Sequence, residues 1–335
     1  MTRSDAHPLR VAIVGAGAIG GLFAAWLSQL PQVQLSVLAR GTTLQALRHQ
    51  GLQLTDAQGT RSVKVHATDD PASLGPQDLV VLAVKGPAVK DVAPAVRALL
   101  APQGRVLVAM NGVPWWFFHG MGGACEGLQL PSVDPDGSLA TTLPAAKVVG
   151  CVVHISSATA GPAQVRHVNG NGLIIGEPAG GDSPRVQALA ATLQQAGFAV
   201  TVSPRIQRDI WYKLWGNMTM NPVSALTGAT CDRILDDPLV RGFINAVMIE
   251  AQAIGARIGC TIDQSPEDRH TVTRKLGAFK TSMLQDVEAG RAIELDALVG
   301  TVRDIGQHLQ LPTPHTDALL GLTRLMAQTR GLYPA

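Results

Sequence analysis

A lysine and two asparagines recur at helical spacing in the stretch DIWYKLWGNMTMNPVSAL, residues 209–226. Lys213, Asn217 and Asn221 are four residues apart, so they share one face of a predicted helix. The opposite face is apolar and comprises Trp211, Leu214, Trp215 and Met218. Amides hydrogen-bond carbonyl, hydroxyl and carboxylate groups, and a neighbouring ammonium group can donate a proton. We interpret the polar face as one turned toward a cleft; the alternative is a partly exposed lysine on an ordinary packed helix.

Two further polar residues lie in TSMLQDVEAGRAIELDALV, residues 281–299. We expect Ser282 on a helix that Gly290 ends, and Glu294 in the first turn of the next helix. A carboxylate is favoured at any helix N-terminus. For this segment alone, a capping role therefore explains Glu294 as well as a role in a site does.

Lys85 and Asn111 stand at the ends of two buried strands, DLVVLAVK (78–85) and RVLVAMNG (105–112). In doubly wound folds, ligands bind at the carboxyl edge of the parallel sheet, where these residues are expected. Asn-Gly is also a plain turn signal, so Asn111 by itself decides nothing.

The elements that would position these residues begin with VAIVGAGAIGGLFAAWL, residues 11–27. An apolar strand runs into G-x-G-x-x-G and then into an apolar helix. The first glycine permits the tight turn, the second lets a pyrophosphate approach the backbone, and the third lets helix and strand pack closely. The helix N-terminus then favours the phosphates. We predict a dinucleotide site at Gly15, Ala16, Gly17, Ala18, Ile19 and Gly20, with a ligand-free strand–helix turn as the alternative.

The second strand, VQLSVLAR, indicates which dinucleotide binds. NAD-dependent proteins place an acidic residue at the end of this strand to accept a hydrogen bond from the ribose 2′-hydroxyl. Arg40 stands there instead, and a cation suits a 2′-phosphate. We therefore predict NADP, with a solvated surface arginine as the alternative.

Length and composition fit a compact protein with two domains. The chain has 335 residues, of which 46% are hydrophobic and 16% charged, and its net charge is +2. The pattern alternates strand and helix at first and is helical after Pro204, so we predict an α/β Rossmann-type domain over 1–204, with a doubly wound, mostly parallel sheet, and an all-α domain over 205–335. The helix around Asn221 should end or bend at Pro222.

Composition also argues against several classes of function. A net charge of +2 gives no hint of a nucleic-acid partner. The start has no apolar leader, and no run reaches the about 18 apolar residues of a membrane span. The four cysteines form no CxxC and the nine histidines no close cluster, so we expect no metal site and reduced thiols in a cytoplasmic protein.

Taken together, the motifs GAGAIGG, LAVK, NG, WYKLWGNMTMNP and SMLQDVEAGRAIELD resemble the ketopantoate reductase family, in order along nearly the whole chain. The resemblance implies reduction of the 2-keto group of ketopantoate to D-pantoate by NADPH, in pantothenate biosynthesis. It implies a site in the cleft between a Rossmann domain and a helical domain, and leaves a homodimer open. Lys213 would be the general acid, with Glu294 orienting it and contacting the cofactor ribose. Asn217, Asn221 and Ser282 would bind substrate, Asn111 would lie beside substrate and nicotinamide, and Arg40 and Lys85 would flank the 2′-phosphate.

Three departures from the family pattern lie around the substrate. The NG step is followed by VPWWFF (113–118), Ile293 replaces a hydroxyl residue, and the segment that often supplies another asparagine reads GATCDR (228–233). A family paralogue acting on a bulkier 2-keto acid is therefore one alternative. The others are a β-hydroxyacid dehydrogenase of the 6-phosphogluconate dehydrogenase type and a non-catalytic NADPH sensor.

Overall fold

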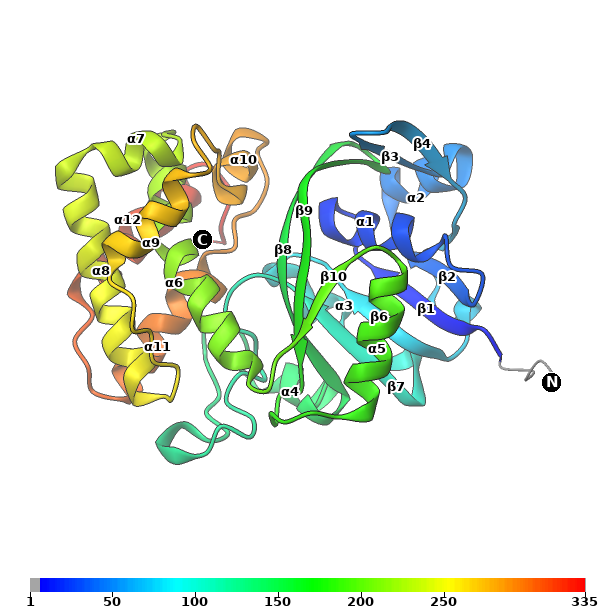
Figure 1. Cartoon of the computed structure of the whole chain (residues 1–335), viewed down its shortest axis with the longest axis horizontal. Coiled ribbons are helices and arrows are strands. Elements are labelled where there is room, and N and C mark those ends of the chain that lie inside the picture. The colour runs from blue at the N-terminus through cyan, green and yellow to red at the C-terminus, as the bar shows by residue number, and fades with distance from the viewer. Residues whose placement is uncertain (1–6, 335) are drawn as a thin grey trace. The chain divides into compact units, whose positions relative to one another are not determined.

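The computed structural model describes residues 7–334, which fold into two compact units (Figure 1). The first unit runs up to Met110 and then from Ser138 to Ile206; the second comprises Asn111–Gly137 and the chain from Gln207 onward. The sequence pattern placed residues 111–137 in the first domain, whereas in the structure they pack with the helices of the second unit. Their hydrogen bonds to distant residues such as Ala297 and Asp304 account for this, and no local pattern reports such contacts.

Within residues 7–334, the first unit holds one sheet of ten strands in the order β4-β3-β9-β8-β7-β6-β1-β2-β5, with β10 paired to β9. The strands are β1 (Leu9–Val14), β2 (Val33–Leu38), β3 (Leu52–Asp56), β4 (Gly59–Val63), β5 (His66–Thr68), β6 (Gln77–Leu82), β7 (Leu100–Ala109), β8 (Val148–Gly161), β9 (Gln164–Gly176) and β10 (Ala199–Val202). Only the pairs β3–β4 and β8–β9 are antiparallel. The predicted Rossmann-type, mostly parallel sheet is confirmed.

The centre of this sheet is apolar on both faces, as the strand sequences predict. In β1, Val11 and Ile13 are fully buried and pair in parallel with β2 on one side and β6 on the other. Among the helices of this unit, α1 buries Phe23, whose ring stacks on Phe198 at 4.6 Å between centroids. The helices are α1 (Ala18–Leu27), α2 (Gly41–Gln50), η1 (Pro71–Leu74), η2 (Gly86–Ala88), α3 (Val89–Leu99), α4 (Ser138–Thr142), η4 (Ala145–Lys147) and α5 (Pro184–Gln195).

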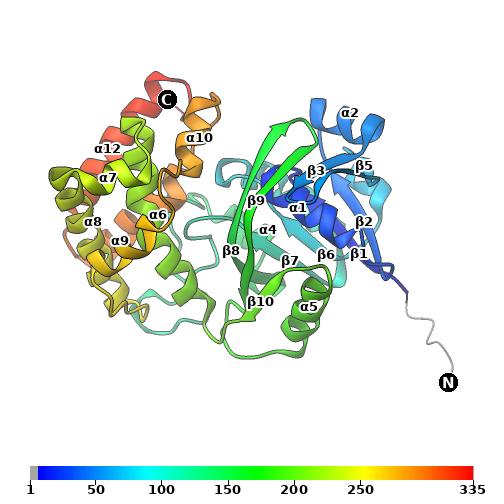
Figure 2. The same ribbon diagram turned by 45° about the horizontal axis from the view of Figure 1, so that its top comes forward.

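Two parts of the sheet differ from the sequence pattern. The hairpin β3–β4 was not predicted, because its strands are short and polar at alternate positions. By their sequence, AQVRHVN (163–169) and GLIIGEP (172–178) have the pattern of two short consecutive strands, but most of both belongs to one long strand, β9, paired with β8 (Figure 2). The ladder between β8 and β9 shifts register near Gly170, which has a φ of +75°. This irregularity explains why the strand pattern of the sequence is interrupted there.

The second unit is helical, as predicted, and within the described chain it contains one short helical turn in a loop and eight further helices. They are η3 (Gly123–Cys125), α6 (Ile206–Thr227), α7 (Cys231–Asp236), α8 (Pro238–Arg257), α9 (Pro266–Arg274), α10 (Ser282–Glu288), the π-helix η5 (Asp296–Gly300), α11 (Thr301–His308) and α12 (Pro314–Thr329).

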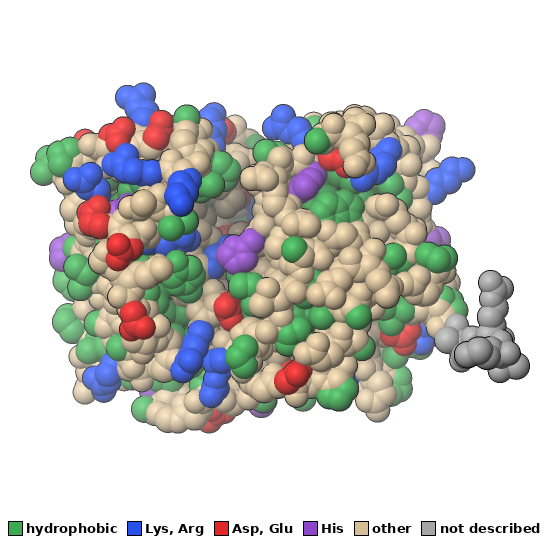
Figure 3. Space-filling model, in the orientation of Figure 1, with side chains coloured by type: hydrophobic (Ala, Val, Ile, Leu, Met, Phe, Trp, Pro, Cys, Tyr) green, Lys and Arg blue, Asp and Glu red, His purple; other side chains and the backbone are tan. Residues whose placement is uncertain are grey.

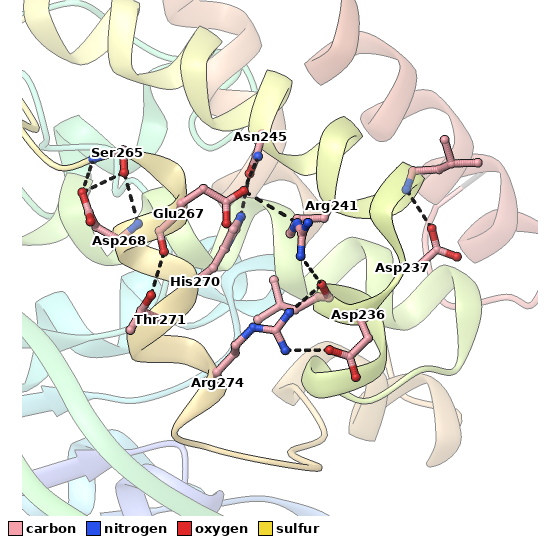
Figure 4. A network of polar contacts seen from close by, with 12 residues as sticks. Asp236, Asp237, Arg241, Asn245, Ser265, Glu267, Asp268, His270, Thr271 and Arg274 are labelled. Carbon is pink, nitrogen blue, oxygen red and sulfur yellow. Dashed lines mark hydrogen bonds and ion pairs between the residues drawn. The ribbon is translucent and has the colours of Figure 1, made fainter.

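A polar network joins α8 to α9 (Figure 4). His270 is 3% exposed, and its Nε2 lies 2.6 Å from Oδ1 of Asn245. The amide of Asn245 donates to Glu267 at 2.9 Å, and Arg274 donates to Asp236 at 2.6 Å. Burial, the largest cause, lowers the pKa of His270.

The surface has no simple charge pattern on the face drawn in Figure 3, where basic and acidic side chains are interspersed. One helix of the described chain, α8, is long and apolar enough by composition to cross a membrane, with a mean hydropathy of 1.2. A single such helix is weak evidence, because helices inside soluble proteins pass the same test.

Candidate active site

The helix α6 carries the polar face that the sequence predicts as a site. Trp211, Leu214, Trp215 and Met218 are at most 2% exposed, so the predicted apolar face is buried. The indole of Trp215 donates to the carbonyl of Met248 at 2.9 Å and fixes α6 against α8. The expected end of the helix at Pro222 is wrong: α6 continues through Pro222 to Thr227. Pro222 has no backbone N–H to donate, but burial of the surrounding residues stabilises the helix by more than the loss of this hydrogen bond costs.

Lys213 and Asn111 meet in the second unit, although they are 102 residues apart in the chain. The Lys213 ammonium donates to Oδ1 of Asn111 at 2.8 Å, and the contact is partly buried. Lys213 itself is half-buried, which suits a group that must reach a ligand and still be held in place. This contact assembles a cation and an amide from two distant segments.

Gly112 holds Asn111 in place against the segment that follows Glu294. Gly112 has a φ of +83°, and a Cβ there would lie 2.4 Å from the carbonyl oxygen of Ala297. The next residue, Val113, donates its backbone N–H to that same oxygen at 2.8 Å. Only glycine therefore allows this close approach.

The segment around Glu294 is irregular. Glu294 immediately precedes the first helical residue, so its expected place inside the first turn is wrong. The helix that follows is a π-helix, Asp296–Gly300. π-Helices are rare and are frequent at functional sites. The widened turn leaves the Ala297 carbonyl accepting from both Val113 and the hydroxyl of Thr301.

Asn221 and Ser282 form a second pair within the same unit. The Asn221 amide donates to the Ser282 hydroxyl at 3.4 Å. Next to this pair, the hydroxyls of Ser224 and Thr281 hydrogen-bond each other, and Thr281 caps α10 by accepting from the N–H of Leu284 at 3.2 Å. Thus α6 and α10 are held together where both predicted substrate residues lie. Asn217 lies half-buried between Lys213 and Asn221 on α6.

The glycine motif in the first unit has the geometry that a bound pyrophosphate requires. Gly15 has a φ of +97°, and a Cβ on Gly20 would lie 1.9 Å from the Gly15 carbonyl oxygen, so both must be glycine. A Cβ on Gly17 would meet no atom within 4 Å, so space is open beside this residue. Gly17 is the N-cap of α1 and supplies no side-chain acceptor for the first N–H groups of the helix. An anion there would satisfy them, so these residues fit a dinucleotide.

Arg40 and Lys85 follow the two strands that flank β1 in the sheet. Arg40 is exposed and precedes α2 as its N-cap residue, and Lys85 is the N-cap residue of η2. Both therefore lie at the carboxyl edge of the parallel strands, the same edge as the glycine motif.

Neither metal chemistry nor a reactive thiol is supported among residues 7–334. These residues contain no group of three or more His, Cys, Asp or Glu placed to hold a metal ion. All four cysteines are buried, and none of them forms a disulfide. Burial raises the pKa of Cys231 to about 11, so its thiol stays protonated at neutral pH.

The aromatic run after the NG step is buried: Trp115, Trp116, Phe117 and Phe118 are at most 7% exposed. The rings of Phe117 and Trp211 lie 6.1 Å apart, so part of the run packs on the apolar face of α6. Ile293 is 1% exposed, so this departure from the family pattern also lies among buried residues.

Sequence reasoning missed the residues that support the predicted ones. Gly112 and Ala297 were not singled out, and the contact between Tyr333 and Asp296 was not foreseen. The signal for Gly112 was the glycine of NG, which also fits an ordinary turn.

Comparisons with known proteins bear on most of the chain. The model of the family "Ketopantoate reductase PanE/ApbA" matches residues 11–180, and that of its C-terminal domain matches residues 205–327. A 2-dehydropantoate 2-reductase of Mesorhizobium japonicum is 41% identical over 97% of this chain and 100% of its own length.

Solved structures show the same similarity. A crystal structure from Ralstonia solanacearum MolK2, described as a candidate ketopantoate reductase, is 58% identical with a TM-score of 0.93, over 97% of this chain and 99% of its own. D-mandelate dehydrogenase, solved with NADH and anilino(oxo)acetate, is 19% identical with a TM-score of 0.82, over 96% of this chain and 100% of its own, and shares the fold.

Proposed function

The chain belongs to the ketopantoate reductase family, and from this premise we propose that it reduces ketopantoate to D-pantoate with NADPH, using Lys213 as the general acid. Membership makes the protein an oxidoreductase. The observation that carries the proposal is the contact of 2.8 Å between the Lys213 ammonium and Asn111 Oδ1, because it holds a proton donor beside an amide.

Lys213 supplies what the reduction of a ketone requires at the oxygen. As C2 accepts the hydride, the carbonyl π electrons move to oxygen and form an alkoxide. A positioned ammonium group stabilises this charge and transfers its proton to the oxygen, leaving the 2-hydroxy acid and a neutral amine that solvent reprotonates. Asn111 accepts a hydrogen bond from Lys213 and so limits the directions in which the ammonium group can point.

The cofactor proposed for this reaction is NADPH, which supplies the hydride when bound. Gly15, Ala16, Gly17, Ala18, Ile19 and Gly20 would hold its pyrophosphate at the N-terminus of α1. Arg40 and Lys85 would pair with the 2′-phosphate. If so, Arg40→Ala weakens NADPH binding by at least about tenfold and leaves NADH binding nearly unchanged, because one charge-assisted contact contributes about 1.5–3 kcal/mol. Equal affinity of the wild type for both cofactors would contradict this assignment.

The remaining predicted residues would hold the substrate and orient the acid. Asn217, Asn221 and Ser282 offer amide and hydroxyl groups for the carboxylate and hydroxyls of a 2-keto acid. Glu294 would contact the cofactor ribose and orient Lys213. In this proposal the first unit serves the cofactor, and the second unit, which includes Asn111, serves the substrate.

We also propose that two copies of the chain associate through α8 and α12, which pack on each other. Leu239 and Ile249 of α8 and Leu322 and Leu325 of α12 are between 57% and 84% exposed. Exposed apolar side chains in this number favour a protein contact. Light scattering should give twice the monomer mass, and Leu322→Glu should reduce it; a monomeric wild type would contradict the dimer. Because none of the four cysteines forms a disulfide, a reducing cytoplasm is the proposed location.

The general acid is tested by Lys213→Ala, with Lys275→Ala as the matched control because Lys275 is exposed at the end of α9. We expect kcat with ketopantoate to fall by roughly 10²–10⁴-fold in Lys213→Ala and to stay near the wild-type value in the control. The dissociation constant of NADPH should change little in both. A Lys213→Ala enzyme whose kcat is within about threefold of wild type would show that another group donates the proton.

A further inference from the structure

The end of the chain turns back after α12 through a defined helix cap. Gly331 has a φ of +66°, its N–H donates to the carbonyl of Gln328 at 3.0 Å, and the N–H of Leu332 donates to that of Ala327 at 2.8 Å. This pattern is a Schellman motif, which reverses the direction of the chain. The side-chain amide of Gln328 donates to the carbonyl of Pro334 at 3.0 Å and holds the reversed tail.

The reversed tail meets the segment that carries Glu294. The N–H of Ile293 donates to the carbonyl of Leu332 at 3.2 Å. The hydroxyl of Tyr333 donates to Oδ1 of Asp296 at 2.5 Å. The first contact is at Ile293, one residue before Glu294, and the second is at Asp296, two residues after it. The tail therefore holds the chain on both sides of Glu294.

The same segment continues to Asn111. Ala297, next to Asp296, accepts from Val113 at 2.8 Å and leaves space only for a glycine at position 112. Asn111 then accepts from Lys213 at 2.8 Å. A continuous chain of contacts, all within the second unit, thus leads from the last residues of the protein to the proposed general acid.

Asp296 makes this chain sensitive to the loss of one hydroxyl. Burial, and next the charge of Asp304, raise the pKa of the Asp296 carboxyl, whereas the Tyr333 hydroxyl and Arg324 lower it. Removing the hydroxyl leaves a partly buried carboxyl without this donor, and an unsatisfied carboxyl in such a place costs free energy. Without this donor, the Asp296 carboxyl is more stable when it is hydrated. Its rotation toward water would shift the π-helix that carries it.

We propose that Tyr333 is a positioning residue for the reduction, which fixes residues 293–297 and through them Glu294 and Asn111. The inference rests on the proposed function, because its effect is exerted on the proposed acid and its partners. Tyr333 does not touch the reacting atoms in this account, so its loss slows the reaction without removing any chemical group from it.

The chain offers a matched control because it contains only two tyrosines. The hydroxyl of Tyr212 donates to Gln264 at 2.8 Å on an exposed part of the second unit and has no role in the contacts above. We expect Tyr333→Phe to lower kcat by about tenfold, less than the ~10²-fold that a displacement of 1 Å can cost, while Tyr212→Phe stays within about twofold of wild type. Equal kcat values for both variants would overturn the proposal.

A double-mutant cycle separates positioning from general destabilisation. Because Tyr333 acts through Glu294 and Asn111, Tyr333→Phe should lower kcat by a smaller factor in a Glu294→Gln protein than in the wild type. If Tyr333 only stabilised the structure elsewhere, Tyr333→Phe would lower kcat by the same factor in the wild type and in Glu294→Gln. That result would overturn the proposal.

A spectroscopic titration tests the contact without any activity. In Tyr212→Phe, Tyr333 is the single tyrosine, so its phenolate absorbance can be followed alone. Burial and Asp296 raise the pKa of Tyr333, so Asp296→Asn should bring its titration to lower pH. No change would overturn the contact. If the wild type reduces no 2-keto acid, the proposed function fails while this titration still decides whether the contact exists.

Discussion

Replacing Gly112 by alanine should damage both the fold and the reaction. A left-handed backbone costs an alanine about 1–2 kcal/mol relative to glycine. The added methyl would lie 2.4 Å from the Ala297 carbonyl oxygen and 2.7 Å from its Cβ, a clash that neither backbone can relieve in place. Overpacking of this kind typically costs a further 1–3 kcal/mol. We therefore expect Gly112→Ala to lose about 2–5 kcal/mol of unfolding free energy.

Gly259→Ala isolates the cost of the backbone alone. Gly259 has a φ of +77°, close to that of Gly112, but an added methyl there meets no atom within 4 Å. Urea unfolding should show a loss of about 1–2 kcal/mol in this variant. Steady-state NADPH oxidation should show a kcat near wild type for Gly259→Ala and a loss of roughly 10–100-fold for Gly112→Ala, because Asn111 and Lys213 separate. Equal stability losses together with an unchanged kcat in Gly112→Ala would refute this reasoning.

Three further predictions concern pH and specificity. Burial lowers the pKa of His270 below the usual histidine value of about 6.5, so the unfolded chain binds more protons than the folded one. The free energy of unfolding should therefore be highest above about pH 6.5 and fall below it, and His270→Gln should reduce this pH dependence of the urea midpoint. Burial raises the pKa of Glu250, but the hydrogen bonds that its carboxylate accepts from the backbone and side chains of His315 and Thr316 together outweigh burial and lower it. Glu250→Gln should therefore cost about 1–3 kcal/mol of unfolding free energy near pH 7 and less as the pH falls below about 4.5; a difference that stays constant with pH would contradict this. We expect Trp115 or Trp116 to line the substrate pocket, so Trp115→Ala and Trp116→Ala should change the ranking of 2-keto acids by kcat/KM, with about 1–3 kcal/mol for each methylene. A uniform loss of kcat/KM for every substrate would show that neither indole lines the pocket.

The local patterns of the sequence predicted the elements that bury one clear face. The strand β1 and helix α1 follow from an apolar run, three glycines and a second apolar run. Gly20 packs so closely on the Gly15 carbonyl that a Cβ would not fit, in agreement with the close packing predicted for the third glycine. The buried tryptophans of α6 follow from helical spacing in the same way. In these cases the information lies within about one turn of the chain.

Contacts between distant segments could not be predicted from such patterns. Nothing near Asn111 in the sequence indicates that it meets Lys213, and nothing near Gly112 points to Ala297. The π-helix at Asp296–Gly300 forms where the chain is held by Val113 on one side and Tyr333 on the other. Likewise, α6 passes through Pro222 because buried neighbours on both sides stabilise it, which local propensity does not include.

In the proposed reaction, a hydride passes from NADPH to C2 of ketopantoate on this protein. The most direct measurement uses NADPH carrying deuterium at both C4 positions, with the product analysed by mass spectrometry and NMR. Direct hydride transfer should place one deuterium at C2 of each pantoate, in equal amount to the NADPH oxidised, and Lys213→Ala should show almost no turnover. Oxidation of NADPH without labelled pantoate, or no oxidation with ketopantoate at all, would contradict it.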